Sequence, residues 1–157
     1  MPDIIQQFDE QALVWIAQNI RSAMLDPFME LYTQLGNAGM LFIALGVLML
    51  FFKPTRKAGF SALCAMLIGL IVVNFTIKPL VSRPRPWLVM ENFVNLVPEH
   101  DPNSFPSGHT NAAFAFALAA CVSAPRRWMK ITAVCMAVVM GLSRLYVGVH
   151  FPSDVLA

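Results

Sequence analysis

Three cationic side chains are spaced so that together they could hold one phosphate group. Lys78 precedes Arg85 by seven positions, and Arg144 stands near the end of a later apolar stretch. A phosphoryl group in transfer spreads its negative charge over three oxygens, so its catalysis requires positioned cations. Arginine matches two phosphate oxygens with a planar donor fork, and lysine supplies a compact point charge. We predict that these three side chains bind phosphate together.

Residues 106–109, with the sequence Pro-Ser-Gly-His, precede a run that favours a helix beginning near Thr110. The free N–H groups and the positive dipole end of a helix N-terminus attract anions. Gly108 lets the backbone approach phosphate closely, and the hydroxyl of Ser107 can donate a further hydrogen bond. His109 is then placed to protonate a leaving alkoxide or phosphate.

His150 and Asp154 are four residues apart, and Pro152 between them is compatible with the first turn of a helix. At this spacing the carboxylate can reach the imidazole and fix its tautomer, which leaves the other ring nitrogen free to attack phosphorus. We therefore predict a two-step cycle. His150 displaces the leaving group while His109 donates a proton, and water then hydrolyses the phosphohistidine with His109 as base.

Each of these motifs also has an ordinary explanation when it is taken alone. A lone cation at the end of an apolar stretch usually extends its head group to the interface, and Pro-Ser-Gly is a common turn. Their joint occurrence favours one site. We assign Arg83 a supporting role and His100 a place on the surface. The connection over residues 87–105 is either a lid over the site or a plain surface loop.

The composition indicates an integral membrane protein. The chain of 157 residues is 57% hydrophobic and 13% charged, whereas soluble domains carry about a quarter charged residues. The net charge of +2 does not suggest a surface for nucleic acid. Cys64, Cys121 and Cys135 lie in apolar runs without paired or metal-like spacing, so we interpret them as small buried residues.

Four apolar stretches organise the chain, at residues 35–52, 58–77, 110–124 and 131–146. The first two approach the roughly 20 residues that cross a bilayer, and the shorter second pair either extends into flanking residues or sits deep in a bundle. Basic connections at 53–57 and 125–130 join each pair. The positive-inside rule places these connections in the cytoplasm and all three motifs on the extracytoplasmic side.

The first 34 residues have a different pattern. Residues 1–10 are largely polar and acidic and contain no cleavable signal. Apolar residues then recur at helical spacing over 8–34 with charges between them, and Pro27 should break the run. An amphipathic helix lying at the interface and a short crossing helix both fit this pattern.

Taken together, the three motifs closely resemble the signature of the type 2 phosphatidic acid phosphatase superfamily. All three parts of that signature match in order and without a substitution. The resemblance implies an all-α, polytopic transmembrane helix bundle of six helices, with a metal-independent and cofactor-free site at the extracytoplasmic interface. It assigns phosphate binding to Lys78, Arg85, Ser107, Gly108 and Arg144, and catalysis to His109, His150 and Asp154.

One departure from the family concerns the C-terminus, because the sequence stops at Ala157, where the family's last transmembrane helix should begin. We therefore expect residues 1–157 to form a single domain, with an amphipathic region at 1–34 and a motif-bearing core at 35–157 that is incomplete at its C-terminal end. If that helix is missing, Asp154 should lie on a fraying terminus and activity should be weak.

These observations favour a multi-pass phosphatase of the bacterial plasma membrane that acts on a lipid headgroup, with undecaprenyl diphosphate as the leading substrate. Phosphatidylglycerophosphate, phosphatidic acid and diacylglycerol pyrophosphate are close alternatives. A lipid phosphotransferase, a vanadate-dependent oxidase and a degenerate lipid-binding subunit also remain open. The sequence leaves the oligomeric state undetermined.

Overall fold

The protein is described by a computed structural model over residues 3–157, and this range is helical apart from turns, loops and one isolated bridge between Pro84 and Asn103. The expectation of an all-α fold is confirmed. The elements are α1 (Asp3–Asn19), α2 (Asp26–Leu35), η1 (Asn37–Gly39), α3 (Met40–Leu50), α4 (Arg56–Gly69), η2 (Leu70–Ile77), α5 (Lys78–Val81), α6 (Pro86–Val89), α7 (Gly108–Ser123), α8 (Arg127–Tyr146) and α9 (Pro152–Leu156).

Among residues 3–157, two helices are long and apolar enough to cross a membrane. One is the continuous helix Arg56–Val81, which joins α4, η2 and α5, and the other is α8 at Arg127–Tyr146. Helices α2 and α3 together would make a third span, broken by a bend of 54°. The predicted stretches at 58–77 and 131–146 therefore correspond to full-length helices, whereas 35–52 is the second arm of a bent pair.

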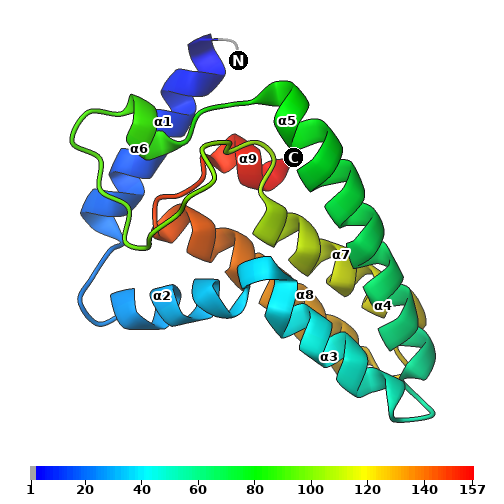
Figure 1. Ribbon diagram of the computed structural model, residues 1–157. Helices are drawn as coiled ribbons and strands as arrows, with labels where there is room; N and C mark the ends of the chain where they lie inside the picture. Colours follow the sequence, from blue (N-terminus) through cyan, green and yellow to red (C-terminus); the bar gives the residue numbers. More distant parts are fainter. Residues whose placement is uncertain (1–2) are drawn as a thin grey trace.

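Helix α7 occupies the centre of the bundle, between α4 and α8 (Figure 1). Its side chains at Ala113, Ala117 and Ala120 are buried, and their small size lets the neighbouring helices approach closely. The two larger core residues Phe42 and Phe116 pack against each other between α3 and α7. Of the two alternatives that the short apolar stretch at 110–124 allowed, the structure therefore shows the one in which it lies deep in the bundle.

The N-terminal region is two helices rather than one. Helix α1 ends at Asn19, and α2 starts at Asp26 with Pro27 in its first turn, so the break precedes the proline that was expected to cause it. Tertiary contacts hold this break, because Arg21 donates hydrogen bonds to the carbonyl oxygens of Tyr146 and Val94. Helix α1 then packs against α8 and α9.

The motifs and the basic connections lie at opposite ends of the bundle (Figure 1). The turns that join α3 to α4 and α7 to α8 come together at one end, where residues of both line a common pocket. Helices α1, α5, α6 and α9 gather at the other end, around the start of α7. This second end brings the three motifs into one region.

Candidate active site

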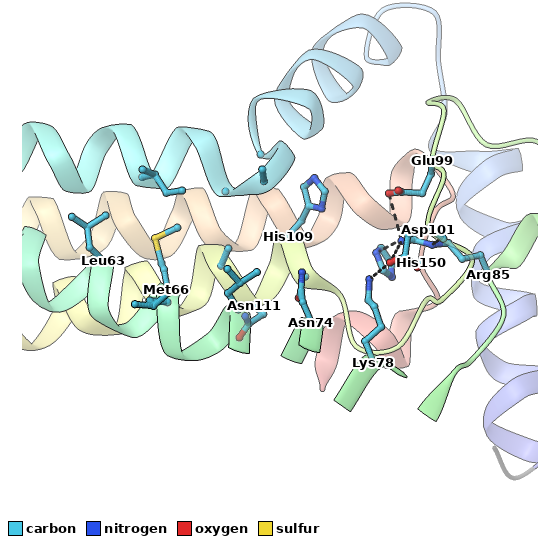
Figure 2. Close-up of a pocket in the computed structure, with 18 residues that line it drawn as sticks. Leu63, Met66, Asn74, Lys78, Arg85, Glu99, Asp101, His109, Asn111 and His150 are labelled. Atoms are coloured by element: carbon cyan, nitrogen blue, oxygen red, sulfur yellow. Dashed lines mark hydrogen bonds and ion pairs between the residues drawn. The ribbon is translucent and has the colours of Figure 1, made fainter. Parts of the chain in front are cut away.

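Five of the predicted site residues line a single cavity of about 560 Å³ (Figure 2). They come from four separate parts of the chain: the end of the Arg56–Val81 helix, the segment before α6, the start of α7, and the loop between α8 and α9. These five residues are Lys78, Arg85, Gly108, His109 and His150. The other three, Ser107, Arg144 and Asp154, do not line the cavity. Asp154 lies 3.6 Å from His150, Arg144 pairs with Glu99, which also lies near Arg85, and Ser107 caps the helix that carries Gly108 and His109.

The first motif is held by a sharp turn at the end of the long helix. Lys78 begins α5, which ends at Ser82 in a left-handed conformation with φ of 47°. The chain is then extended at Arg85 until Pro86 opens α6. The Arg85 guanidinium is buried, with Nε donating to the carbonyl oxygen of Asp101 at 2.7 Å and Nη1 donating to that of Val149 at 2.9 Å.

The second motif forms the N-terminus of α7, as the sequence predicts. Ser107 is the N-cap residue, and its hydroxyl oxygen accepts a hydrogen bond from the hydroxyl of Thr110 at 2.9 Å. A β-carbon at Gly108 would lie 3.0 Å from Oδ1 of Asn74, so glycine lets the two helices meet here. His109 projects from the first turn, with Nε2 at 3.0 Å from Oδ1 of Asn37.

The geometry around His150 selects one tautomer. Arg85 Nη1 lies 3.1 Å from Nε2 of His150, and a guanidinium can only donate, so Nε2 carries the lone pair. The ring proton then lies on Nδ1, which is 3.6 Å from Oδ2 of Asp154. This is the tautomer that the proposed attack on phosphorus requires, because the free lone pair is on the nitrogen that faces the cations.

Asp154 is held more firmly than the sequence suggested. Its carboxylate is 1% exposed, Oδ2 accepts the backbone N–H of Phe151 at 2.8 Å, and Oδ1 accepts a hydrogen bond from Arg83 at 2.6 Å. The expectation of a fraying position was therefore wrong. A residue three positions from the last one is fixed here because buried donors satisfy both of its oxygens.

Burial, together with the positive charges of Arg85, Arg144 and Lys78, lowers the pKa of His150 well below its usual range. A lowered pKa favours the neutral ring, so His150 should stay neutral between about pH 8 and 5.5, where a free histidine with a pKa near 6.5 titrates. Ring ¹⁵N shifts of the purified protein, assigned with His150→Gln, measure this. A titration of His150 near pH 6.5 would contradict the burial and tautomer described above.

Arg144 is positioned by the N-terminal region and by the long connection. Its Nη1 donates to the Thr33 hydroxyl of α2 at 2.7 Å, and its Nη2 lies 2.8 Å from Oε2 of Glu99. The residue is buried at the end of α8. Thr33 is a partner that sequence reasoning missed, since a lone threonine on an amphipathic helix gives no signal of its own.

Two acidic residues of the long connection form ion pairs with the cations that are predicted to bind phosphate (Figure 2). Glu99 Oε2 is 2.8 Å from Arg144 and 3.5 Å from Arg85, while Asp101 Oδ2 is 2.6 Å from Lys78 and 3.7 Å from Arg85. Burial alone would raise the pKa of Asp101, but the hydrogen bond from Lys78 and the nearby cations outweigh it and hold that pKa below its usual value. The three cations among the predicted phosphate-binding residues, Lys78, Arg85 and Arg144, therefore already have carboxylate partners.

A phosphate that enters this site must displace these carboxylates, which gives a testable consequence. Glu99→Gln and Asp101→Asn should each lower KM by up to about fivefold, because partly exposed ion pairs contribute about 0.2–1 kcal/mol. The measurement is KM for a lipid phosphate in detergent. Glu91→Gln, at an exposed position of the same connection, is the matched control and should change nothing. A higher KM in the two site variants would mean that these carboxylates assist binding instead.

The geometry is that of a phosphoryl-transfer site placed at one end of a membrane-type helix bundle, and comparisons with known proteins agree. Residues 58–157 match the model of the PAP2 superfamily, and the chain belongs to this family. It is 37% identical over 119 residues to the undecaprenyl-diphosphatase of Sulfolobus acidocaldarius, which covers 73% of this chain and 55% of that protein. It is 33% identical over 165 residues to phosphatidylglycerophosphatase B of Bacillus subtilis, covering 97% of this chain and 76% of that protein.

Two crystal structures share the fold. The PAP2-type phosphatidylglycerolphosphate phosphatase of Bacillus subtilis superposes with a TM-score of 0.74 at 30% identity, over 98% of this chain and 78% of that one. LpxE of Aquifex aeolicus gives a TM-score of 0.81 at 29% identity, over 95% and 86% of the two chains. The family and the fold expected from the three motifs are confirmed. The chain spans about half the length of the archaeal relative.

Proposed function

We propose that this protein is a membrane-embedded lipid phosphatase that hydrolyses a phosphate or diphosphate headgroup through a phosphohistidine at His150, with undecaprenyl diphosphate as its substrate. One observation carries the proposal. One end of the cavity is lined by the cations Lys78 and Arg85 and by two imidazoles. Its other end is lined by apolar side chains of α3, α4 and η2. These are Ile43, Leu63, Met66, Leu67 and Leu70.

This division of the cavity suits an amphipathic substrate. A charged headgroup would lie among Lys78, Arg85 and His109, while its hydrocarbon chain would run along the apolar helices toward the bilayer. Relatives named as undecaprenyl-diphosphatases support a prenyl diphosphate. Phosphatidylglycerophosphate is the second candidate, because a relative that aligns with nearly the whole chain bears that name.

The first chemical step forms a P–N bond and breaks a P–O bond. The Nε2 lone pair of His150 attacks phosphorus, and Arg85 moves its Nη1 donor from that nitrogen to a phosphate oxygen. His109 gives its proton to the departing lipid oxygen, and Asp154 stabilises the charge that develops on the imidazole ring. Lys78, Arg85 and Arg144 neutralise the equatorial oxygens.

The second step returns the enzyme to its starting state. Water attacks the phosphohistidine, His109 accepts a proton from that water, and the P–N bond breaks to release phosphate. The Ser107 hydroxyl and the N–H groups at the start of α7 are the proposed donors to the phosphate in both steps. These donors contribute to catalysis mainly by holding the phosphate in position and by stabilising its negative charge.

We further propose that the site faces the extracytoplasmic side of a bacterial plasma membrane. The two basic connections lie together at the end of the bundle opposite the site, which is the distribution that the positive-inside rule associates with the cytoplasm. An outward-facing site would suit recycling of a lipid carrier on that side.

The proposal is tested by phosphate release from purified protein in detergent. Undecaprenyl diphosphate, phosphatidylglycerophosphate and phosphatidic acid are compared at equal concentration, with His150→Gln as the blank. The first should show the highest kcat/KM. A different order would overturn the substrate assignment, and no release from any of them would overturn the phosphatase. Labelled phosphate that appears in a second lipid would indicate a phosphotransferase instead.

A further inference from the structure

Arg83 is a buried cation of the first motif region that takes no part in the cavity. It is 6% exposed, and unlike Lys78 and Arg85 it does not line the cavity but bonds residues of α1 and α9. Its guanidinium lies over the ring of Phe151, 4.1 Å from the ring centroid. The proposed mechanism therefore leaves a charged side chain unexplained at the place where burial is costly.

The partners of Arg83 come from both ends of the chain. Nη1 donates to Oδ1 of Asp154 at 2.6 Å and to the Ser153 hydroxyl at 2.7 Å, while Nη2 donates to Oδ2 of Asp9 at 2.7 Å and to Oε1 of Gln6 at 2.7 Å. One guanidinium thus bridges two carboxylates. Each donor nitrogen serves one carboxylate, so the planar fork sets the distance and the relative orientation of the two.

Asp9 is the second member of this network. It is 0% exposed on a helix whose other face presents Phe8 and Trp15 to the surroundings. Its Oδ1 accepts the backbone N–H of Ser153 at 3.0 Å, and its Oδ2 bonds the Ser153 hydroxyl. Asp9 therefore holds both Arg83 and the first turn of α9, which carries Asp154.

The network ends on the nucleophile. Arg83 engages Oδ1 of Asp154, so Oδ2 is left to face Nδ1 of His150. Without Arg83, Oδ1 would lose its 2.6 Å hydrogen bond, and the carboxylate would be held less firmly, mainly by the Phe151 N–H at Oδ2. Arg85 directs the lone pair to Nε2, and Oδ2, at 3.6 Å from Nδ1, supports the proton on the other nitrogen. A displaced Oδ2 would therefore weaken the preference for the tautomer that can attack through Nε2.

We propose that Asp9 and Arg83 are positioning residues for the active site. Helix α1 then contributes to the active site, because its Asp9 carboxylate holds Arg83 against Asp154. The inference rests on the proposed function for its kinetic consequences. Its structural consequence, the tautomer of His150, is independent of the substrate.

Asp9→Asn and Arg83→Met should lower kcat about 10- to 100-fold, the loss typical when an outer partner of a reacting group is removed, with KM within about twofold of the original. KM is spared because neither residue lines the phosphate cavity. Arg83→Lys keeps the charge and should recover part of the lost kcat. Asp3→Asn, at an exposed position of the same helix, is the matched control and should leave both constants unchanged.

The second readout separates positioning from simple destabilisation. Ring ¹⁵N spectra should show His150 mainly as the Nδ1–H tautomer in the unaltered protein and as a mixture in Arg83→Met and Asp9→Asn. A thermal melt in detergent reports folding. If either variant does not fold, Arg83→Lys tests the same point, with a smaller shift in tautomer and in kcat.

Two results would overturn the inference: an unchanged kcat in folded Arg83→Met, or a fall in kcat that follows the loss of folded protein while the tautomer of His150 stays the same. If the unaltered protein releases no phosphate at all, the proposed function fails. The tautomer spectra then decide the positioning role by themselves, so the two failures are distinguishable.

Discussion

Replacing His150 with glutamine should lower kcat by at least about 1000-fold, because loss of the proposed covalent nucleophile would remove the whole two-step route and leave only binding and electrostatic stabilisation. Glutamine is close in size to histidine and polar, so the buried position should remain filled and the bundle folded. Initial rates in detergent, together with a thermal melt, measure the two effects separately.

The matched control is His100→Gln. His100 is exposed in the long connection, and we expect full activity from this variant. Rapid acid-free quenching with ³²P-labelled substrate should trap a base-stable phosphoprotein in the unaltered chain and none in His150→Gln. Label retained in that variant would move the nucleophile to another side chain.

Replacing His109 with asparagine should lower the rate of the first step by about 10²- to 10⁴-fold, the usual contribution of a positioned general acid. The loss should depend on the leaving group. Phosphatidic acid expels an alkoxide, which needs the proton, whereas undecaprenyl diphosphate expels a phosphate, which is already a stable anion. The phosphatidic acid reaction should therefore suffer more.

The measurement is the single-turnover rate of phosphoprotein formation for both lipids, because steady-state rates also contain the second step, where His109 acts as base. With the diphosphate, His109→Asn should show a burst of released lipid phosphate followed by slow turnover. Equal losses for the two lipids would contradict the acid role and leave His109 as a binding residue.

The three motifs could be predicted to meet because the alternation of apolar stretches and basic connections places all of them on one side of the membrane. Within the motifs the geometry is local: the turn at Ser82 lies between Lys78 and Arg85, and Asp154 lies in the first turn of α9, four residues after His150. The N-cap role of Ser107 follows from its type and from the helix-forming run after it. Apolar content predicted four stretches, and the burial of α7 was one of the two outcomes that it allowed for the shorter pair.

What could not be predicted are contacts between residues far apart in the chain. Asp9 appears in the sequence as one of several charges on an amphipathic helix, and nothing in its spacing says that it is the buried one, bonded to Ser153 near the other end of the chain. Glu99 and Asp101 lie in a connection with no periodicity, so their pairing with Arg144 and Lys78 had no local signal.

Pairing of the long connection with the cations should also select the kind of ligand that the proposed site accepts. An anionic ligand that binds here replaces the carboxylates of Glu99 and Asp101 as the counter-ion of the cations, so its negative charge must compensate for the loss of both. A singly charged anion such as a sulfate ester gains too little from this exchange, whereas a phosphate dianion or a diphosphate restores the balance. We therefore expect Glu99 and Asp101 to make binding depend on the charge of the anion, through ion pairs that the protein already contains without a lipid.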